Sequence, residues 1–334
     1  MTRGMFDFIQ RDPTYIGSDK DWYVELSQST YFWYDLLIHP PEGFDTKQQI
    51  SDYLKQLQAI VESQLDKRFI YFLAARKKLR FCVSKKPRYS FFGNDLVFYV
   101  EMGREKIQRK VTTKIFDAQT QRPIKPPVEV SDRFITFHYT SNHKVSMSIH
   151  DFLQHTGIEV GINTEVHYIG YTKNPSERPI NGAHRGLSDM LYRVSNEEHD
   201  FFIFYNLFKV SSIGMSPTAP IKFCVANSMV DEIKVDEEGR IIEKSLIKYF
   251  GTETQELNKK KEESELENSL ERLAAKNNIN SVALHIEMNE PSELHRFFSR
   301  SVKPSDKHVF TCRIGNNGVE IVEGSNLAFP MLYT

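Results

Sequence analysis

The stretch that decides the fold reads Val166-His167-Tyr168-Ile169-Gly170-Tyr171-Thr172-Lys173-Asn174-Pro175-Ser176-Glu177-Arg178. Its first half alternates as a β-strand does, which places Tyr168 and Tyr171 on opposite faces of that strand. In its second half, Asn174 is a preferred residue at a helix N-terminus, and Pro175 suits the first helical position. The stretch therefore predicts a strand that ends where a helix begins, with Arg178 in the first helical turn. Backbone donors and a cation at such a junction can hold a phosphate group.

A second informative stretch covers residues 240–250, where apolar residues recur at helical spacing. At about 100° per residue, one stripe is formed by Ile242, Leu246, Ile247 and Phe250. Glu243 falls inside that stripe, and a carboxylate at the edge of a core is costly unless something pairs with it. A metal ion or an arginine would be such a partner. The alternative is that Glu243 is an ordinary helix acid favoured by the helix dipole.

Together these pieces resemble the GIY-YIG nuclease family, which includes homing endonucleases, restriction enzymes and excision-repair nucleases. Tyr168-Ile169-Gly170 matches the second triplet of the family name, and Arg178 lies eight residues after Gly170. Glu243 stands on a later helix, as the metal-binding glutamate of the family does, and Asn258 follows fifteen residues later. The resemblance covers roughly residues 134–258. It implies that Glu243 holds Mg²⁺ (or Mn²⁺), that Arg178 neutralises charge on the phosphate and that Tyr168 positions the attacking water or helps to remove its proton.

The sequence departs from the family pattern at the first triplet. No Gly-Ile-Tyr stands about ten residues before Tyr168. Tyr139 could replace the missing tyrosine if an insertion separates its strand from that of Tyr168. His184 is the other candidate for the general base, since histidine titrates near neutral pH. Pro179 and the Asn181-Gly182 turn interrupt the helix expected after Arg178.

Basic and aromatic residues are interleaved in the first half of the chain. Twelve Lys or Arg residues lie between Arg76 and Lys114, and only three acidic residues oppose them. Basic residues meet phosphates and aromatic residues stack on bases, so this stretch is expected to bind nucleic acid. The candidate contacts are Lys77, Lys78, Lys85, Lys86 and Arg88, with Lys173 and Asn258 near the catalytic residues. The alternative is a solvated basic sheet edge, which would also discourage aggregation.

Composition limits the classes of protein that remain. The chain has 334 residues, of which 40% are hydrophobic, and a formal net charge of −1, so it can bury a core and its overall charge indicates no partner. Three dispersed cysteines, Cys82, Cys224 and Cys312, argue against a disulfide framework and a structural zinc site. There is no signal sequence at the N-terminus and no apolar run long enough to span a membrane, so a soluble cytoplasmic protein without membrane association is expected.

The expected fold class is α+β, with a small antiparallel sheet flanked by helices in the nuclease-like core. Residues 44–66 read as a helix capped by Asp45, residues 118–133 as a proline-containing linker, and residues 291–298 as a helix. Strands are expected at 96–100, 133–140, 165–171, 201–210, 221–226 and 281–287, and a hairpin at 309–322. Three segments follow: an N-terminal nucleic-acid-engaging domain (1–130), the nuclease-like core (131–260) and a C-terminal α/β extension with a charged helix (261–334).

The function expected from the sequence is metal-dependent hydrolysis of phosphodiester bonds in nucleic acid, with DNA favoured, which would suit restriction or phage defence. A homo-oligomer is compatible with it. The competing hypothesis is a nuclease-like fold that binds nucleic acid without cutting it. A purely structural or assembly protein would account for the charged helix but leaves Glu243 unexplained.

Overall fold

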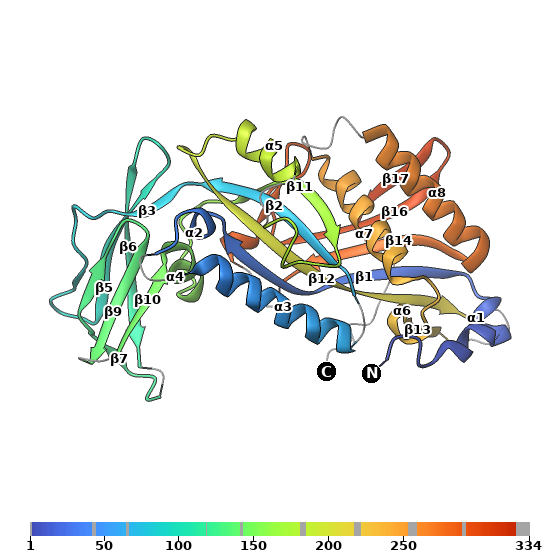
Figure 1. Cartoon of the computed structure of the whole chain (residues 1–334), viewed down its shortest axis with the longest axis horizontal. Coiled ribbons are helices and arrows are strands. Elements are labelled where there is room, and N and C mark those ends of the chain that lie inside the picture. The colour runs from blue at the N-terminus through green and yellow to red at the C-terminus, as the bar shows by residue number, and fades with distance from the viewer. Residues whose placement is uncertain are drawn as a thin grey trace.

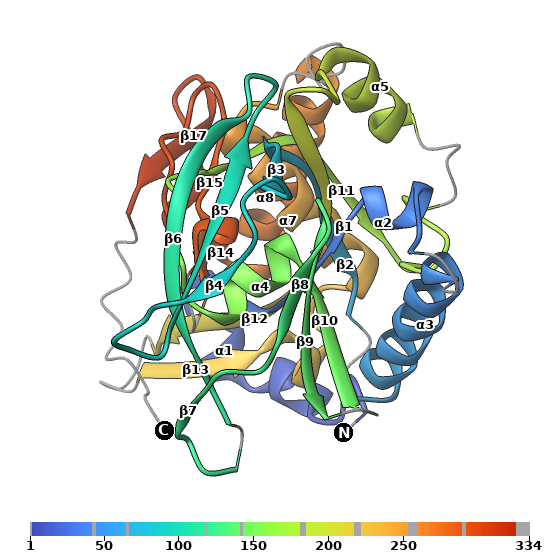
Figure 2. The same cartoon turned by 90° about the vertical axis from the view of Figure 1, so that its left-hand side faces the viewer.

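A computed structural model describes residues 2–41, 45–64, 67–117, 119–140, 143–180, 185–216, 222–252, 259–288 and 292–324. The protein has a mixed α+β fold with 30% helix and 41% strand, which confirms the expected class. Its largest sheet has nine strands and is mixed, whereas only small antiparallel sheets were expected. Two smaller antiparallel sheets lie at one end of the molecule (Figures 1 and 2).

The nine-stranded sheet has the order β15-β11-β2-β12-β1-β14-β16-β17, and β13 pairs with β12. Its strands are β1 (Lys20–Trp33), β2 (Phe69–Lys77), β11 (Thr164–Thr172), β12 (His199–Met215), β13 (Lys222–Ala226), β14 (Ile279–Glu287), β15 (Phe297–Phe298), β16 (Lys307–Gly315) and β17 (Gly318–Glu323). The β1–β14 and β11–β15 pairs are parallel, and the others are antiparallel. The sheet draws strands from all three segments expected from the sequence.

Strand β2 lies between β11 and β12 and is apolar on both faces. Phe69, Tyr71 and Leu73 belong to a hydrophobic cluster on one face. Ile70 and Phe72 belong to the larger cluster on the other. This strand has helices on both sides, so its run of buried residues is nearly continuous rather than alternating with polar ones.

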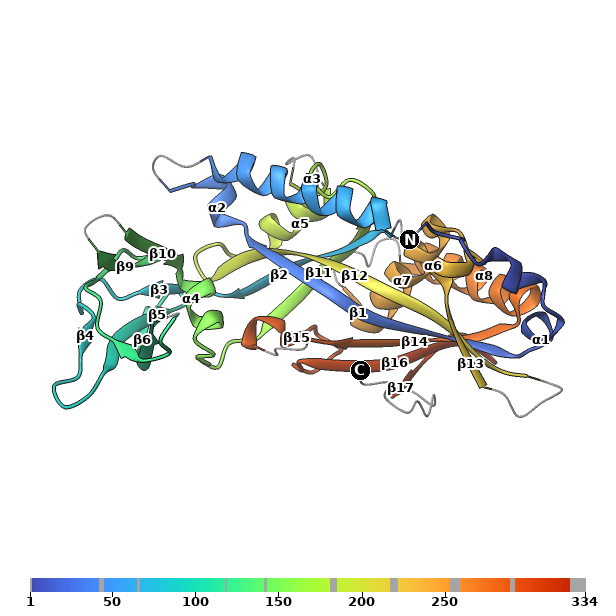
Figure 3. The same ribbon diagram turned by 90° about the horizontal axis from the view of Figure 1, so that it is seen from below.

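Helices cover both faces of the sheet (Figures 1 and 3). The Tyr71 face packs against α3 (Thr46–Gln64) and α5 (Arg185–Arg193). The opposite face packs against α7 (Val235–Phe250) and α8 (Lys259–Asn277). Short helices complete the described part: α1 (Pro13–Ile16), α2 (Asp35–Ile38), α4 (Ile149–His155), α6 (Asn227–Val230) and 3₁₀ turns at Asp7–Arg11 and Glu293–His295. Across the described residues, no helix is both long and apolar enough to cross a membrane.

Several elements lie where local sequence patterns predicted them. The carboxylate of Asp45 accepts from the backbone N–H of Gln48 at 3.0 Å, as expected for the cap of α3, and Leu54 is fully buried in the stripe below it. The strands expected at 165–171 and 201–210 are β11 and β12, and the C-terminal hairpin is β16–β17. Gly318, in its turn, has φ +101°, a conformation that favours glycine.

The smaller sheets and α4 form what we call the small lobe. One sheet contains β3 (Leu79–Phe81), β4 (Arg88–Tyr89), β5 (Asp95–Met102), β6 (Ile107–Phe116) and β7 (Pro123–Ile124). The other contains β8 (Val128–Val130), β9 (Phe134–Thr140) and β10 (His143–Ser148). The lobe is held together by aromatic packing: the Phe152 ring of α4 lies 5.5 Å from that of Phe98 and 5.7 Å from that of Phe137.

Two element predictions are wrong. Residues 118–133 contain β7 and β8 rather than only a linker, and Pro123 is tolerated because it stands at the first position of a short strand. Residues 291–298 do not form the expected helix. In the described part of that segment, Glu293 is buried and accepts from the backbone N–H groups of Val160 and Gly161, so tertiary contacts override the local helix pattern.

Candidate active site

Two tyrosines from neighbouring strands stack near one edge of the sheet. Tyr71 on β2 and Tyr168 on β11 have ring centroids 6.1 Å apart and planes inclined by 21°. Their hydroxyl groups share a hydrogen bond. Burial nevertheless raises the pKa of both phenols above the usual value of 10. Both side chains therefore stay protonated at neutral pH.

Glycines make room for the two rings. In the β2–β11 register Tyr71 lies opposite Gly170, and a Cβ added to Gly170 would overlap the Tyr71 hydroxyl. A Cβ added to Gly186, at the start of α5, would come within 2.6 Å of the Tyr168 ring. The glycine of the Tyr168-Ile169-Gly170 triplet therefore has a steric role: it lets the Tyr71 ring lie across the strand.

A β-bulge sets the direction of the Tyr168 side chain. The β2–β11 register shifts between Val166 and Tyr168, so β11 holds one extra residue there. Val166 packs on the α7 side of the sheet, whereas Tyr168 packs on the α3 and α5 side. Tyr171 packs on the α7 side, so the prediction that Tyr168 and Tyr171 face opposite sides is confirmed, although Val166 and Tyr168 do not share a face as simple alternation requires.

Arg178 lies on a turn that follows β11. Its backbone N–H donates to the carbonyl of Asn174 at 3.0 Å, and the hydroxyl of Tyr205 donates to the carbonyls of Pro175 and Arg178 at 2.9 and 3.2 Å. The helix expected to begin at Asn174 is a single turn, because Pro179 follows at once. The Arg178 side chain is exposed, and its positive charge acts on Tyr71, Tyr168 and Glu243.

Glu243 reaches this group from α7. Its Oε1 accepts from the backbone N–H of Tyr171 at 3.1 Å, so the carboxylate meets the outer edge of β11. Gly239, one turn earlier on α7, lets the helix approach, since a Cβ there would lie 3.1 Å from Cβ of Arg68. Within the described part of the chain Glu243 forms no ion pair. Burial, reinforced by the negative charge of Glu262, raises the pKa of Glu243 from its usual 4.5 to about 7.

Basic residues lie near this group along β11 and α7. Lys173 is exposed, directly after β11. Arg240 donates from Nε to the hydroxyl of Tyr171 at 3.0 Å, and Arg68 pairs with Asp236 at 2.7 Å. A phosphate diester approaching Tyr168 would therefore meet positive charge on several sides.

The donor set fits one Mg²⁺ or Mn²⁺ ion with few protein ligands. The described residues hold no cluster of three or more His, Cys, Asp or Glu side chains that could bind a metal. Mg²⁺ commonly keeps several waters and uses one or two carboxylates together with substrate phosphates. Glu243 suits that role because burial and the charge of Glu262 raise the pKa of its half-buried carboxylate, as expected where negative charge is poorly compensated.

The prediction that the strand of Tyr139 lies beside that of Tyr168 is wrong. Tyr139 is on β9, which pairs with β8 and β10 in the small lobe and not with β11. It lines a cavity of about 300 Å³ with Phe137, Phe152 and His155. The neighbouring strand carries Tyr71 instead, 168 − 71 = 97 residues before Tyr168 in the sequence. His184 and Asn258 lie outside the described residues.

The sequence indicates that Tyr71 lies on a buried strand, but this strand is far from Tyr168 in the sequence. Phe69-Ile70-Tyr71 opens a strand rich in aromatic and aliphatic residues, which is typical of a buried strand. Nothing near Tyr168 in the sequence marks this strand as its neighbour, because the two segments are 97 residues apart.

The basic residues predicted to bind nucleic acid differ in exposure. Lys85, Lys86 and Arg88 are exposed on the small lobe. Lys77 and Lys78 are half-buried at the end of β2, and Lys78 donates from Nζ to the carbonyl of Asn196 at 2.8 Å. The first three therefore present free cationic surface, whereas Lys78 also holds the chain between α5 and β12.

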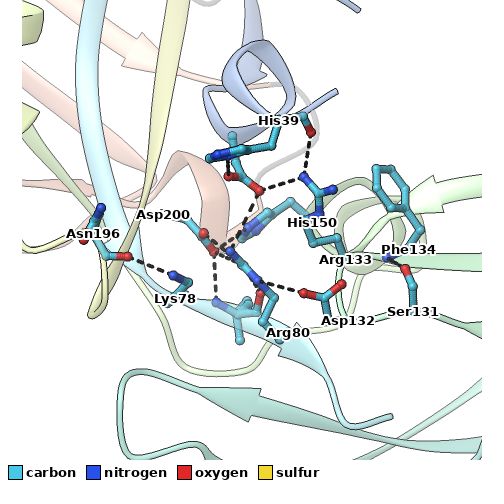
Figure 4. A network of polar contacts seen from close by, with 12 residues as sticks. His39, Lys78, Arg80, Ser131, Asp132, Arg133, Phe134, His150, Asn196 and Asp200 are labelled. Carbon is cyan, nitrogen blue, oxygen red and sulfur yellow. Dashed lines mark hydrogen bonds and ion pairs between the residues drawn. The ribbon is translucent and has the colours of Figure 1, made fainter. Parts of the chain in front are cut away.

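A second polar cluster, which we call the Asp200 cluster, joins the small lobe to the main sheet (Figure 4). Asp200 accepts from the backbone N–H of Leu79 at 2.9 Å, from Arg80 at 2.9 and 3.0 Å, and pairs with His150 at 3.0 Å. Nearby, Arg133 pairs with Asp35 at 3.1 Å. Sequence reasoning missed this cluster, because its members come from distant segments with no shared motif.

Comparisons with protein-family models, with curated proteins and with solved structures found no match to this chain.

Proposed function

We propose that this protein is a metal-dependent endonuclease that hydrolyses phosphodiester bonds in nucleic acid, with DNA as the favoured substrate. The observation that carries the proposal is the stacked Tyr71–Tyr168 pair, on which the charges of Arg178 and Glu243 act. These side chains combine a hydroxyl pair, an exposed cation and a poorly compensated carboxylate. The resemblance to GIY-YIG nucleases supports the same assignment, and a cytoplasmic role in restriction or phage defence would suit it.

Each residue has a distinct task in the proposed reaction. Mg²⁺ or Mn²⁺, held by Glu243 and phosphate oxygens, would supply charge neutralisation at the phosphate and at the leaving oxygen. Arg178 neutralises the charge that builds on the phosphoryl oxygens. The hydroxyl of Tyr168 holds the attacking water, and Tyr71 orients that hydroxyl through the hydrogen bond between them. The proton that the water loses passes to a general base, for which His184 is the candidate.

The second candidate function is binding without cleavage. It is favoured because the described residues hold no cluster of three or more His, Cys, Asp or Glu side chains that could bind a metal, and a site with one weakly held metal can lose catalysis and still bind phosphate. In that case the basic residues near Tyr168 would bind the phosphate backbone without taking part in cleavage.

The experiment that separates the two candidates compares cleavage by the wild type with that by Glu243→Gln and Arg178→Ala. Substrates are plasmid, linear duplex, single-stranded DNA and RNA, each with Mg²⁺, Mn²⁺ or chelator. Metal-dependent cutting should fall by at least about 10³-fold in both variants, because both side chains act mainly in the transition state. Glu237→Gln is the matched control: Glu237 lies on the same helix but pairs with Arg272 at 2.9 Å.

The outcomes point in different directions. Cutting that survives in Glu243→Gln at the wild-type rate would show that the site is wrongly assigned. Tight binding by the wild type with no cutting of any substrate would favour the binding module.

A further inference from the structure

The most exposed large apolar side chains of the small lobe form a pair at a hairpin tip. Phe91 is 90% exposed and Phe92 is 98% exposed, between β4 and β5. Their rings pack edge to face with centroids 4.9 Å apart. The turn that carries them is closed by a hydrogen bond from the N–H of Ser90 to the carbonyl of Asp95 at 2.8 Å. Of the large apolar side chains in the described residues, only Tyr192 is similarly exposed, at 93%.

The fold does not need these two rings. The lobe already has a closed aromatic core made by Phe81, Phe98, Phe137 and Phe152. Neither Phe91 nor Phe92 belongs to a described hydrophobic cluster. A pair of phenylalanines held out in water by a closed turn therefore points to a contact outside the chain.

A line of positive charge leads to the pair. Leu96, Phe98 and Val100 of β5 point inward, so the alternate residues and their partners on neighbouring strands face outward. The outward face carries four cations and one aromatic ring: Lys85, Arg88, Lys110, Lys114 and Tyr99. Lys114 lies opposite Asp95, next to the phenylalanine turn, and Lys110 lies about 13 Å further along β6. The acids on that face are Asp95 and Glu101.

We infer that the outward face of β5–β6 binds the phosphate backbone of duplex nucleic acid, and that Phe91 and Phe92 insert between neighbouring base pairs and unstack them. The inference rests on the proposed function and extends it, because it makes a locally opened duplex the substrate. Apolar wedges of this kind unstack a base step and kink the duplex. Duplex nucleic acid fits better than a lipid surface, because the cations run along a sheet face away from the tip rather than encircling it. A linear polyanion can follow such a row.

The test uses a duplex that contains 2-aminopurine, whose fluorescence rises when its neighbours unstack. The full chain carries Glu243→Gln so that the duplex is not cut. Binding should raise the fluorescence several-fold, and Phe91→Ala/Phe92→Ala should remove most of that rise while lowering affinity by no more than about tenfold. Both phenylalanines are exposed, so this double variant should fold normally. Tyr192→Ala, on α5, is the matched control and should leave the signal unchanged.

The cations are tested separately. Lys110→Glu/Lys114→Glu should lower affinity and reduce the slope of log affinity against log salt by about two or more, because two phosphate contacts are lost. The phenylalanine variant should keep the wild-type slope, because it removes no charge.

Several outcomes would overturn the inference. One is binding of the duplex with no rise in fluorescence, and another is an equal rise in the double alanine variant. A third is Phe-dependent binding to vesicles of phosphatidylserine and phosphatidylcholine without binding to duplex, which would assign the tip to a lipid surface. Failure of the proposed function gives a different result. Phe-dependent unstacking without cleavage by the wild type would support the inference and reject the nuclease. Cleavage without unstacking would support the nuclease and reject the inference.

Discussion

Glu243 and Asp200 are both carboxylates withdrawn from water, yet their surroundings shift their pKa values in opposite directions. Burial and Glu262 raise the pKa of Glu243 to about 7. Burial alone would also raise the pKa of Asp200, but His150, Arg80 and the N–H of Leu79 together lower it below its usual value. The difference lies in the partners: Asp200 accepts from a guanidinium and a backbone N–H and pairs with an imidazole, whereas Glu243 accepts one backbone N–H.

The comparison separates a structural role from a functional one. A carboxylate whose acceptor capacity is filled by the protein stabilises the fold and has little capacity left for a ligand. A carboxylate left with poorly compensated charge costs stability, and such groups cluster where ligands or metals bind. Asp200 joins the small lobe to the main sheet, and Glu243 meets the edge of β11. The raised pKa of Glu243 therefore supports the proposal that Glu243, rather than Asp200, would hold a metal ion.

The largest expected effect is on stability, and it tests whether Asp200 and Glu243 differ as proposed. Asp200→Asn should lower the free energy of unfolding by about 3–5 kcal/mol, because it leaves the positive charge of Arg80 without its buried partner. Glu243→Gln should change the same quantity by less than about 1 kcal/mol, or raise it, because it removes a poorly compensated charge. Urea unfolding followed by circular dichroism measures both.

The matched control for that experiment is Asp132→Asn. Asp132 also lies 4.0 Å from Arg80, but its side chain is 63% exposed, so this variant should behave as wild type. Equal destabilisation by Asp200→Asn and Glu243→Gln would remove the distinction between the two carboxylates.

The tyrosine pair also shows where sequence reasoning succeeds and where it stops. Helix α3, strand β11 and the place of Glu243 on α7 follow from local signals: a cap, an alternation and a stripe. Tyr71 could not be found this way, because its pairing with β11 spans 97 residues of sequence, and the small lobe fills most of the interval. Local spacing carries no information about such a non-local pairing.

The Asp200 cluster was beyond prediction for the same reason. His150, Arg80 and Asp200 come from α4, β3 and β12, and each is unremarkable in its own segment. The helix wrongly predicted at 291–298 shows the opposite error: the local pattern is helix-like, but Glu293 accepts from the backbone N–H groups of Val160 and Gly161, and these tertiary contacts override it.

A smaller effect is expected on the cleavage rate when the Tyr71–Tyr168 pair is disturbed. Gly170→Ala should lower the cleavage rate by about 10–100-fold, because its methyl group displaces the buried Tyr71 ring, and overpacking of this kind costs about 1–3 kcal/mol of stability. Tyr71→Phe removes the hydroxyl without crowding and should lower the cleavage rate with little loss of stability. Single-turnover kinetics and urea unfolding report the two quantities. If Tyr71→Phe cuts at the wild-type rate, the Tyr71 hydroxyl has no part in the reaction.

The smallest expected effect is the pH dependence of the free energy of unfolding that comes from buried histidines. Burial, with the charge of Arg76, lowers the pKa of His295 from its usual 6.5 to about 4, and burial likewise lowers that of His167 to about 4. Between pH 6.5 and 4 the unfolded chain therefore binds more protons than the folded one. The free energy of unfolding should fall as the pH falls through that window, by roughly 1–3 kcal/mol for each histidine.

His295→Gln tests this sign directly. Its free energy of unfolding should depend less steeply on pH between 6.5 and 4, by up to about one proton, whatever its absolute stability. His143→Gln is the control, because His143 is exposed on β10. An unchanged slope in His295→Gln would mean that His295 takes up its proton while the chain is still folded, and that its burial does not hold it neutral.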